Sequence, residues 1–312
     1  MKIMRFIGIV FALFSAGSPS DTSAQDSGKK YKVYMVSNSH LDTQWRWDVK
    51  ATIDDYLYNT AVQNLALLEK YPHYVFNFEG AVKYEWIKEY YPHLFERIRK
   101  FVADGRWNIS GASFEANDPN MPSSESFIRN ILLAQEFYKK EFGIKSKDMF
   151  LPDCFGFSQV MPTLGHHCGL IGFSTQKLSW RTEPLVGDSK TPFPIGLWEG
   201  VDGARIMVAL EPGRYSWNEF PEGDLSANEE LAESARKSPF GIAYRYYGNK
   251  LANGAGDHGG SALPRSIQLL EEGITNGKGP VQLVSATSSQ LYEDYMPYGN
   301  HPELPVFVGE MP

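Results

Sequence analysis

Residues 31–45 read YKVYMVSNSHLDTQW, and this stretch sets the pattern for the rest of the chain. Tyr31–Ser37 is rich in valine and tyrosine, which is typical of a buried strand. His40 and Asp42 follow shortly after it. Ligands of parallel α/β folds bind beyond the carboxyl ends of the strands, so a polar cluster at this point is a candidate site.

Strand and helix signals alternate along the chain beyond this stretch. Further strands are predicted at Tyr74–Phe78, Trp107–Ser110, Asp148–Leu151, Ile171–Thr175, Arg205–Leu210 and Val281–Ser285. Helices are predicted from the apolar stripe at Tyr58–Leu68, at Val82–Val102, from a Ser123 or Ser124 cap to Phe142, at Pro264–Gly273 and at Ser288–Tyr295. Long loops are expected at Pro184–Pro194 and Pro212–Lys237. This order implies an α/β fold of parallel strands with helical crossovers, either a barrel or an open doubly wound sheet.

The composition of the chain limits which classes of protein it can belong to and which kinds of partner it can bind. The chain has 312 residues, of which 42% are hydrophobic and 14% aromatic, so it can bury a sizeable core. It has only 2 cysteines and is not a disulfide scaffold, although the sequence leaves open whether Cys154 and Cys168 pair. The net charge of −7 and the lack of any Lys/Arg-rich run argue against a nucleic-acid partner. We therefore expect a neutral small molecule or a glycan as ligand.

The N-terminus has the three zones of a signal peptide. Lys2 and Arg5 precede the short apolar stretch Phe6–Ala16, and Thr22–Ala24 is a small-residue cleavage site. The apolar stretch is too short to span a bilayer, which takes about 20 residues. Residues 1–24 are therefore predicted to be removed, which leaves an exported chain, periplasmic or secreted, that spans residues 25–312.

The cluster after the first strand suits a metal ion. His40 and Asp42 are two residues apart, so in an extended segment both side chains point to the same face. An imidazole and a carboxylate side by side are ligands that Zn²⁺ takes. Trp45 adds a flat apolar surface on which a sugar ring can rest. The alternative is a plain His–Asp hydrogen bond in a loop, because short matches are common.

A second cluster follows the predicted strand Asp148–Leu151. Asp153 stands there between Pro152 and a turn at Gly156, which indicates a carboxylate held in place rather than one free in solvent. The alternative is an aspartate that only caps a helix or closes a turn.

Together these residues resemble a known family. The segment His40–Trp45 is similar to the H-x-D-x-x-W motif of glycoside hydrolase family 38, the α-mannosidases. Further similar segments follow in the family's order at Gly105–Trp107, Asn120–Ser126, Leu151–Ser158, Thr175–Trp180, Trp198–Gly203 and Gly256–Gly260. The likeness spans roughly Val33 to Met311, and several ordered motifs are more specific than any one of them.

The resemblance implies a seven-stranded α/β barrel that hydrolyses terminal α-mannosides with retention of configuration. It also implies that His40, Asp42 and Asp153 bind one zinc ion and that Asp153 is the nucleophile. The family's fourth ligand, a histidine, and its helical-bundle and β-sandwich domains would lie beyond Pro312. We therefore expect the chain as written to bind zinc weakly and to have low activity.

A retaining glycosidase needs a second carboxyl group as acid and base, about 5–5.5 Å from the nucleophile. Asp257 is the candidate, because it lies in a glycine-rich loop that allows close approach to a ligand. The alternative is a simple turn aspartate. The adjacent His258 is a candidate substrate-binding residue together with Trp45.

Two other functions remain open at this point. A zinc-dependent deacetylase or amidohydrolase on a similar barrel would need an H-x3-H or H-x-H ligand pair, and the sequence has neither. A non-catalytic glycan-binding remnant of an α-mannosidase would keep a sugar pocket without turnover.

Overall fold

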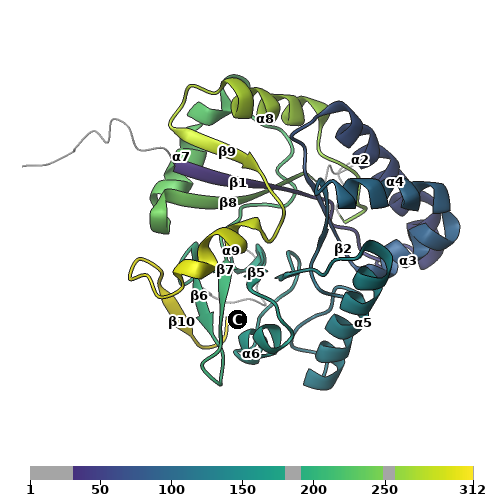
Figure 1. The fold of residues 1–312 in the computed structure, drawn as a ribbon, viewed down its shortest axis with the longest axis horizontal. Helices are drawn as coiled ribbons and strands as arrows, with labels where there is room; N and C mark the ends of the chain where they lie inside the picture. The colour runs from purple at the N-terminus through teal and green to yellow at the C-terminus, as the bar shows by residue number, and fades with distance from the viewer. Residues whose placement is uncertain (1–30, 180–190, 249–256, 312) are drawn as a thin grey trace, which may run out of the picture.

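The computed structural model describes residues 31–179, 191–248 and 257–311 (Figure 1). The predicted signal peptide, residues 1–24, lies outside these ranges, as does most of the predicted loop 184–194. Within the described ranges, no helix combines the length and the apolar character that crossing a bilayer requires. Both cysteines are free thiols, so the pairing that the sequence left open is not formed.

The first sheet is built around β1 (Tyr31–Asn38), and its strands are parallel. One edge of β1 pairs with β8 (Ile242–Gly248) from Lys32 to Asn38. The other edge is divided, because its first five residues pair with β9 (Val281–Ser285) and its last two with β2 (Phe76–Glu79). The strand β3 (Trp107–Ser110) extends the sheet beyond β2. The buried strand predicted at the start of the chain is thus hydrogen-bonded on both of its edges.

The second sheet contains an antiparallel pair that the sequence did not predict. Its order is β10 (Val306–Val308), β6 (Ile195–Glu199), β7 (Arg205–Ala209), β5 (Gly172–Ser174) and β4 (Asp148–Phe150). The antiparallel pair is β6–β7, and the other pairings are parallel. A tight turn joins β6 to β7, in which the Gly203 amide donates to the Gly200 carbonyl at 3.1 Å and Gly203 has a φ of +82°. A turn this short brings the chain straight back and therefore makes the two strands antiparallel.

The expected seven-stranded barrel does not form among the described residues, whose strands make two five-stranded sheets that do not close. The sheets meet where β3 ends beside β4, and there the Ala112 amide donates to the Asp148 carbonyl at 2.9 Å. The Gly111 amide adds a bond to the Asp148 side chain at 3.2 Å. The strands at this junction have only three and four residues, which limits how far they can pair.

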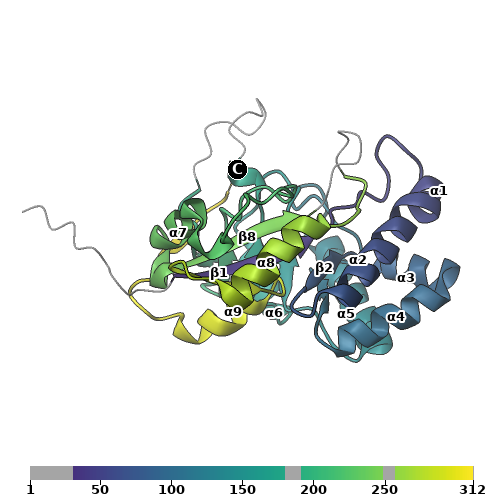
Figure 2. The same ribbon diagram turned by 90° about the horizontal axis from the view of Figure 1, so that it is seen from above.

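Helices cover the sheets, and α2 to α5 lie together at one end of the molecule in both views (Figures 1 and 2). The helices are α1 (Val49–Ala51), which runs into a π-helical segment at Thr52–Leu57, α2 (Tyr58–Lys70), α3 (Ala81–Tyr90), α4 (Pro92–Ala103), α5 (Ser124–Phe142), α6 (Val160–His167), α7 (Glu229–Arg236), α8 (Pro264–Asn276) and α9 (Gln290–Tyr295).

The predicted helix Val82–Val102 is in fact two helices, α3 and α4. Pro92 begins α4, and a residue before proline is disfavoured in the helical conformation, so Tyr91 separates the two. The cap predicted for α5 is confirmed, since the Ser123 hydroxyl accepts from the Ser126 amide and Gly143 ends the helix with a φ of +75°.

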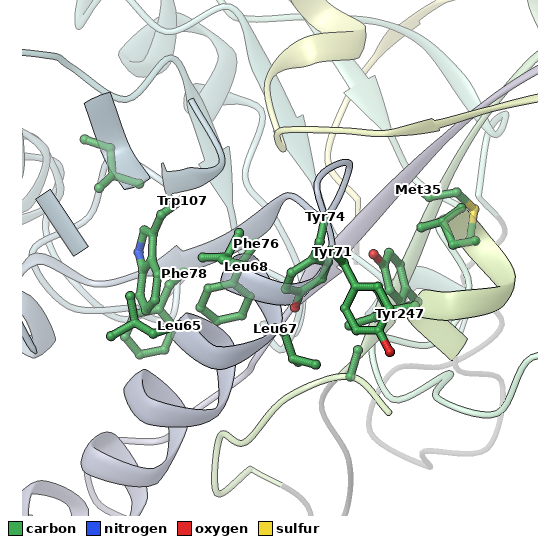
Figure 3. Packing of buried hydrophobic residues seen from close by; sticks show 14 of the residues in the cluster. Met35, Leu65, Leu67, Leu68, Tyr71, Tyr74, Phe76, Phe78, Trp107 and Tyr247 are labelled. Atoms are coloured by element: carbon green, nitrogen blue, oxygen red, sulfur yellow. The ribbon is translucent and has the colours of Figure 1, made fainter. Parts of the chain in front are cut away.

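The packing beside β2 is dominated by aromatic side chains (Figure 3). The rings of Phe76 and Phe78 are stacked with centroids 5.8 Å apart, and Trp107 from β3 meets Phe76 edge-on at 4.8 Å. Leu65 and Leu68 of α2 belong to the same buried cluster. This core fixes β2, and with it the residues at the carboxyl end of the strand.

Candidate active site

The candidate site residues come together beyond the carboxyl ends of β1 and β4. His40 lies two residues after β1, and Asp153 lies three residues after β4. Asp257 reaches them through a short antiparallel bridge between Leu41 and His258. Within this bridge region, the Asp42 amide donates to the Asp257 carbonyl at 3.0 Å. Backbone bonds therefore hold the segment that carries Asp257 against the segment that follows β1.

Three carboxylates face the same nitrogen of His40. The Nε2 atom of the buried His40 ring is 3.3 Å from Oδ1 of Asp42 and 3.3 Å from Oδ2 of Asp153. It is 4.0 Å from Oδ1 of Asp257. The four candidate residues, taken from three separate sequence motifs, thus converge around one atom.

The other nitrogen of His40 is held from behind. Its Nδ1 atom is 3.3 Å from Oε1 of Glu79, the last residue of β2, which is buried. Burial of the ring opposes protonation, but Asp42 and Glu79 outweigh it and raise the pKa of His40 to about 9. The site therefore stabilises positive charge at this ring, which a metal cation could supply in place of the proton.

The carboxylate of Asp153 has a partner that the sequence analysis did not single out. The ammonium of Lys177 forms an ion pair with Oδ1 of Asp153. Lys177 itself is buried and lies over the ring of Phe155 at 4.8 Å. Its position after β5, inside the motif Thr175–Trp180, was the only signal that could have indicated a role.

Asp257 is held in an uncommon backbone conformation. Its φ is +71°, a left-handed value that few residues other than glycine adopt. The hydroxyl of Tyr215 donates to its Oδ1 atom at 2.8 Å, and the ring of Tyr215 lies 5.2 Å from the ring of His40. Tyr215 therefore connects the two, although it lies in a segment where only a long loop was predicted.

The two predicted substrate-binding residues lie at the edge of the site. Trp45 is 53% exposed, with the guanidinium of Arg46 4.3 Å from its ring centre. Its ring meets Trp47 edge-on, and Trp47 stacks on His258 at 4.2 Å. Tyr56 meets His258 edge-on at 4.6 Å and also lies 5.1 Å from Trp47, so the three rings contact one another. A row of aromatic rings thus leads from the segment of Asp257 to the surface.

An open groove begins at this row. It has a volume of about 920 Å³ and lies between α2 and the segment 258–264. The residues at its walls include Tyr56 from the π-helical segment before α2, Asn59 and Gln63 from α2, and His258 and Ser261 from the loop. Aromatic and amide side chains on one wall suit a sugar, which offers both an apolar ring face and hydroxyl groups.

The donor set at His40 fits a zinc ion. The Nε2 atom of His40 is buried and, among the described residues, has no hydrogen-bond partner. Ligand atoms of His40, Asp42 and Asp257 all lie within 4.8 Å of one another, and Asp153 is as close to Nε2 as Asp42 is. One imidazole nitrogen with several carboxylate oxygens is a combination that zinc accepts.

Comparison with known proteins identifies relatives of the whole described chain. The profile of the glycosyl hydrolases family 38 N-terminal domain matches residues 30–310. Alpha-mannosidase G of Dictyostelium discoideum is 31% identical over 289 residues, or 93% of this chain. Alpha-mannosidase 2C1 of Homo sapiens is 30% identical over 284 residues, or 90% of this chain.

The relatives are longer than this chain, which spans about a quarter of their length, 25% and 26% respectively. Among solved structures, an alpha-mannosidase from Enterococcus faecalis V583 superimposes with a TM-score of 0.69 at 21% identity. That match covers 90% of this chain and 31% of the other. It shows that the two share a fold.

Proposed function

Because the chain belongs to glycosyl hydrolase family 38, we propose that it hydrolyses terminal α-mannosidic bonds in glycans, with retention of configuration and with bound zinc. The observation that carries the proposal is the convergence of Asp42, Asp153 and Asp257 on His40 Nε2. The names of the relatives, which are 30–31% identical to this chain, support the α-mannoside as substrate.

His40, Asp42 and Asp153 would hold the zinc ion. The buried and unpartnered Nε2 atom of His40 supplies the nitrogen ligand, and the two carboxylates supply oxygen. When bound, zinc provides a Lewis acid that orients sugar hydroxyls and stabilises negative charge. The Oδ1 atom of Asp153 is engaged by Lys177, which leaves Oδ2 turned toward His40.

In the first step Asp153 would act as the nucleophile. Its carboxylate attacks C1 of the mannose while the bond from C1 to the leaving oxygen breaks, and a glycosyl ester forms. Lys177 would fix the direction of the carboxylate and balance its charge through the ion pair. Asp257 gives its proton to the leaving oxygen in the same step.

In the second step the roles at Asp257 reverse. Water attacks C1, Asp257 takes the proton of that water, and the ester bond to Asp153 breaks. Tyr215 would keep the Asp257 carboxyl group aimed at the reacting oxygen through its 2.8 Å hydrogen bond. Trp45 and His258 would contact the sugar at the edge of the site.

The proposal is tested by incubating the chain with p-nitrophenyl α-mannoside in zinc and after chelation. We expect slow release of p-nitrophenol, in line with the low activity expected for the chain as written. Chelation should abolish this release and added zinc should restore it, and p-nitrophenyl β-mannoside is the control that stays intact. NMR should show α-mannose before β-mannose, as retention requires.

Other outcomes would overturn it. Release that continues after chelation would contradict the proposed role of zinc. If β-mannose appeared first, the proposed retention of configuration would be wrong. Chelator-sensitive release of acetate from N-acetylated sugars would instead favour the deacetylase. Binding of mannose with no hydrolysis would favour the glycan-binding remnant.

We also propose that the protein is exported after removal of residues 1–24, on the strength of the sequence pattern there. Expression of the chain in a bacterial host followed by mass measurement of the product tests this. A product that still carries residue 1 and stays inside the cell would contradict it.

A further inference from the structure

Lys83, in the first turn of α3, is buried completely, with 0% of its surface exposed. Its ammonium lies 3.9 Å from Oε1 of Glu79 and, among the described residues, has no hydrogen-bond partner. Burying an ammonium is costly unless a negative charge compensates it. The proposed reaction uses neither Lys83 nor Glu79, so the pair needs another explanation.

The local backbone is shaped to place this lysine. Gly80, between β2 and α3, has a φ of +87°, which lets the chain turn sharply. A side chain at position 80 would approach the outer part of Lys83 to 3.4 Å. The turn therefore folds the lysine back over the end of β2, where Glu79 stands.

The same carboxylate oxygen that faces Lys83 also faces His40. Oε1 of Glu79 is 3.3 Å from Nδ1 of His40 and 3.9 Å from Nζ of Lys83. The opposite ring nitrogen, Nε2, points at the carboxylates of the candidate metal site. A line of groups thus runs from a buried cation through Glu79 and the imidazole to the proposed zinc ligands.

The positive charge of Lys83 affects a second acidic residue besides Glu79. Glu115 is a second acid affected by it, since burial raises the pKa of Glu115 while Lys83 acts in the opposite direction. The positive charge of Lys83 therefore offsets negative charge on the side of His40 that faces away from Asp42 and Asp153.

We propose that Glu79 and Lys83 are positioning residues for the metal ligand His40. A neutral imidazole carries one N–H and one lone pair, and a carboxylate at Nδ1 fixes the proton there. Glu79 thereby turns the lone pair of Nε2 toward the zinc, and Lys83 supplies the charge that lets Glu79 be buried beside His40. The inference rests on the proposed function only in taking His40 as a zinc ligand.

The test measures zinc affinity of the full chain by competition with a coloured chelator. Glu79→Gln should weaken zinc binding about 10–100-fold, the range found when a partner behind a ligand histidine is lost. Lys83→Met should weaken it in the same direction. Because Lys83 acts through Glu79, the double variant should bind zinc no more weakly than Glu79→Gln alone.

A matched control is available in α5. Glu141 is also a buried acid paired with a lysine, since Lys88 lies 2.8 Å from it, and neither residue touches His40. Glu141→Gln should leave zinc affinity unchanged. If Lys83→Met alone does not fold, the double variant still tests the pair, because it leaves neither charge buried alone.

A second measurement reports on the imidazole itself. ¹⁵N NMR of histidine-labelled, zinc-free chain is recorded above the raised pKa of His40, where the ring is neutral, and His40 is assigned by His40→Asn. It should show the proton on Nδ1 in the wild type and a mixture of tautomers in Glu79→Gln. A merely structural ion pair would leave these signals unchanged.

Separate outcomes overturn the inference and the proposed function. Zinc-dependent mannosidase activity together with equal zinc affinity in Glu79→Gln would overturn the inference alone. If the double variant lost zinc affinity by the sum of the two single losses, Lys83 would not act through Glu79, and its part of the inference would be wrong. A wild-type chain that binds no zinc would overturn the metal part of the proposed function and this inference with it.

Discussion

At the scale of single residues, Asp153 carries the most specific expectation. Replacing Asp153 by Asn should abolish hydrolysis of p-nitrophenyl α-mannoside while the chain stays folded, because an amide cannot form the glycosyl ester. Circular dichroism checks the fold and product absorbance checks the rate.

The matched control is Asp202→Asn. Asp202 is an aspartate whose partners, Thr163 and His167, lie apart from the site. This variant should keep the wild-type rate. If Asp153→Asn retained more than a trace of activity, the nucleophile would have to be another residue.

Asp257 can be tested through the leaving group. Asp257→Asn should slow hydrolysis of an alkyl α-mannoside at least about 100-fold, since general acid catalysis contributes that much or more. Cleavage of 2,4-dinitrophenyl α-mannoside should suffer far less in its first step, because that leaving group needs no proton. Zinc content should stay equal to the wild type.

The alternative for this residue has a different signature. If Asp257 is a metal ligand instead, Asp257→Asn would lose zinc and would slow both substrates alike. Asp257 lies 4.0 Å from His40 Nε2, against 3.3 Å for Asp42, but its carboxylate belongs to the same cluster of possible ligand atoms, so the zinc content of Asp257→Asn decides between the two roles.

The four predicted site residues could be found from sequence because each belongs to a recognisable local pattern. His40, Asp42 and Asp153 follow strand signals, and Asp257 stands in a glycine-rich loop. Their supporting residues could not be found in this way. Glu79 continues a strand that was predicted to end one residue earlier, and Tyr215 reaches Asp257 only through tertiary folding.

At the scale of elements, the predicted strands are buried, but burial alone did not reveal every strand: β6 and β8 are also largely buried and were not predicted. The strand β10 was missed because its residues are only partly buried and give no clear pattern. The helix α7 was missed because it carries only three buried residues among charged ones. Its start is nonetheless encoded, since Asn228 accepts a hydrogen bond from the Leu231 amide.

One element depends on a glycine. A methyl group at Gly172 in β5 would come within 1.9 Å of the ring of Tyr292 from α9. Gly172→Ala should therefore destabilise the chain by about 1–3 kcal/mol, the usual cost of overpacking. Urea unfolding measures the change.

The control is the variant Tyr292→Leu, whose side chain is smaller. The cost of Gly172→Ala should be lower in a Tyr292→Leu background, because the ring that the methyl group would meet is gone. An equal cost in both backgrounds would mean that the clash with Tyr292 is not the cause.

At the scale of the whole molecule, the junction between the sheets rests on Asp148. This buried carboxylate accepts from the Gly111 amide at 3.2 Å and from the Ser146 hydroxyl at 3.1 Å. Burial raises the pKa of Asp148 to about 6, despite these bonds. The sequence indicated strands on both sides of this junction but not that they would stop short of a barrel, because closure depends on how far short strands pair.

The raised pKa gives a stability that depends on pH. The carboxyl group of Asp148 binds its proton more tightly in the folded state than in the unfolded state, where its pKa is about 3.9. Its contribution to the free energy of unfolding is therefore full below pH ~4 and is lost as pH rises through about 6. The free energy of unfolding of Asp148→Asn, compared with that of the wild type, should therefore rise by about 3 kcal/mol between pH 4 and pH 8. Urea unfolding of both proteins measures this, and a difference that is constant with pH would contradict it.

The pairing of β1 on both edges also bears on the order in which parts of the molecule open. Backbone amides that are buried and bonded on both sides of a strand exchange with solvent only when a large part of the molecule unfolds. His40 follows this strand directly, whereas Asp257 is joined to it through the short bridge of Leu41 with His258. Partial opening should therefore separate Asp257, the proposed acid, from the imidazole first, so that the proposed zinc site persists longer than the proposed catalytic arrangement.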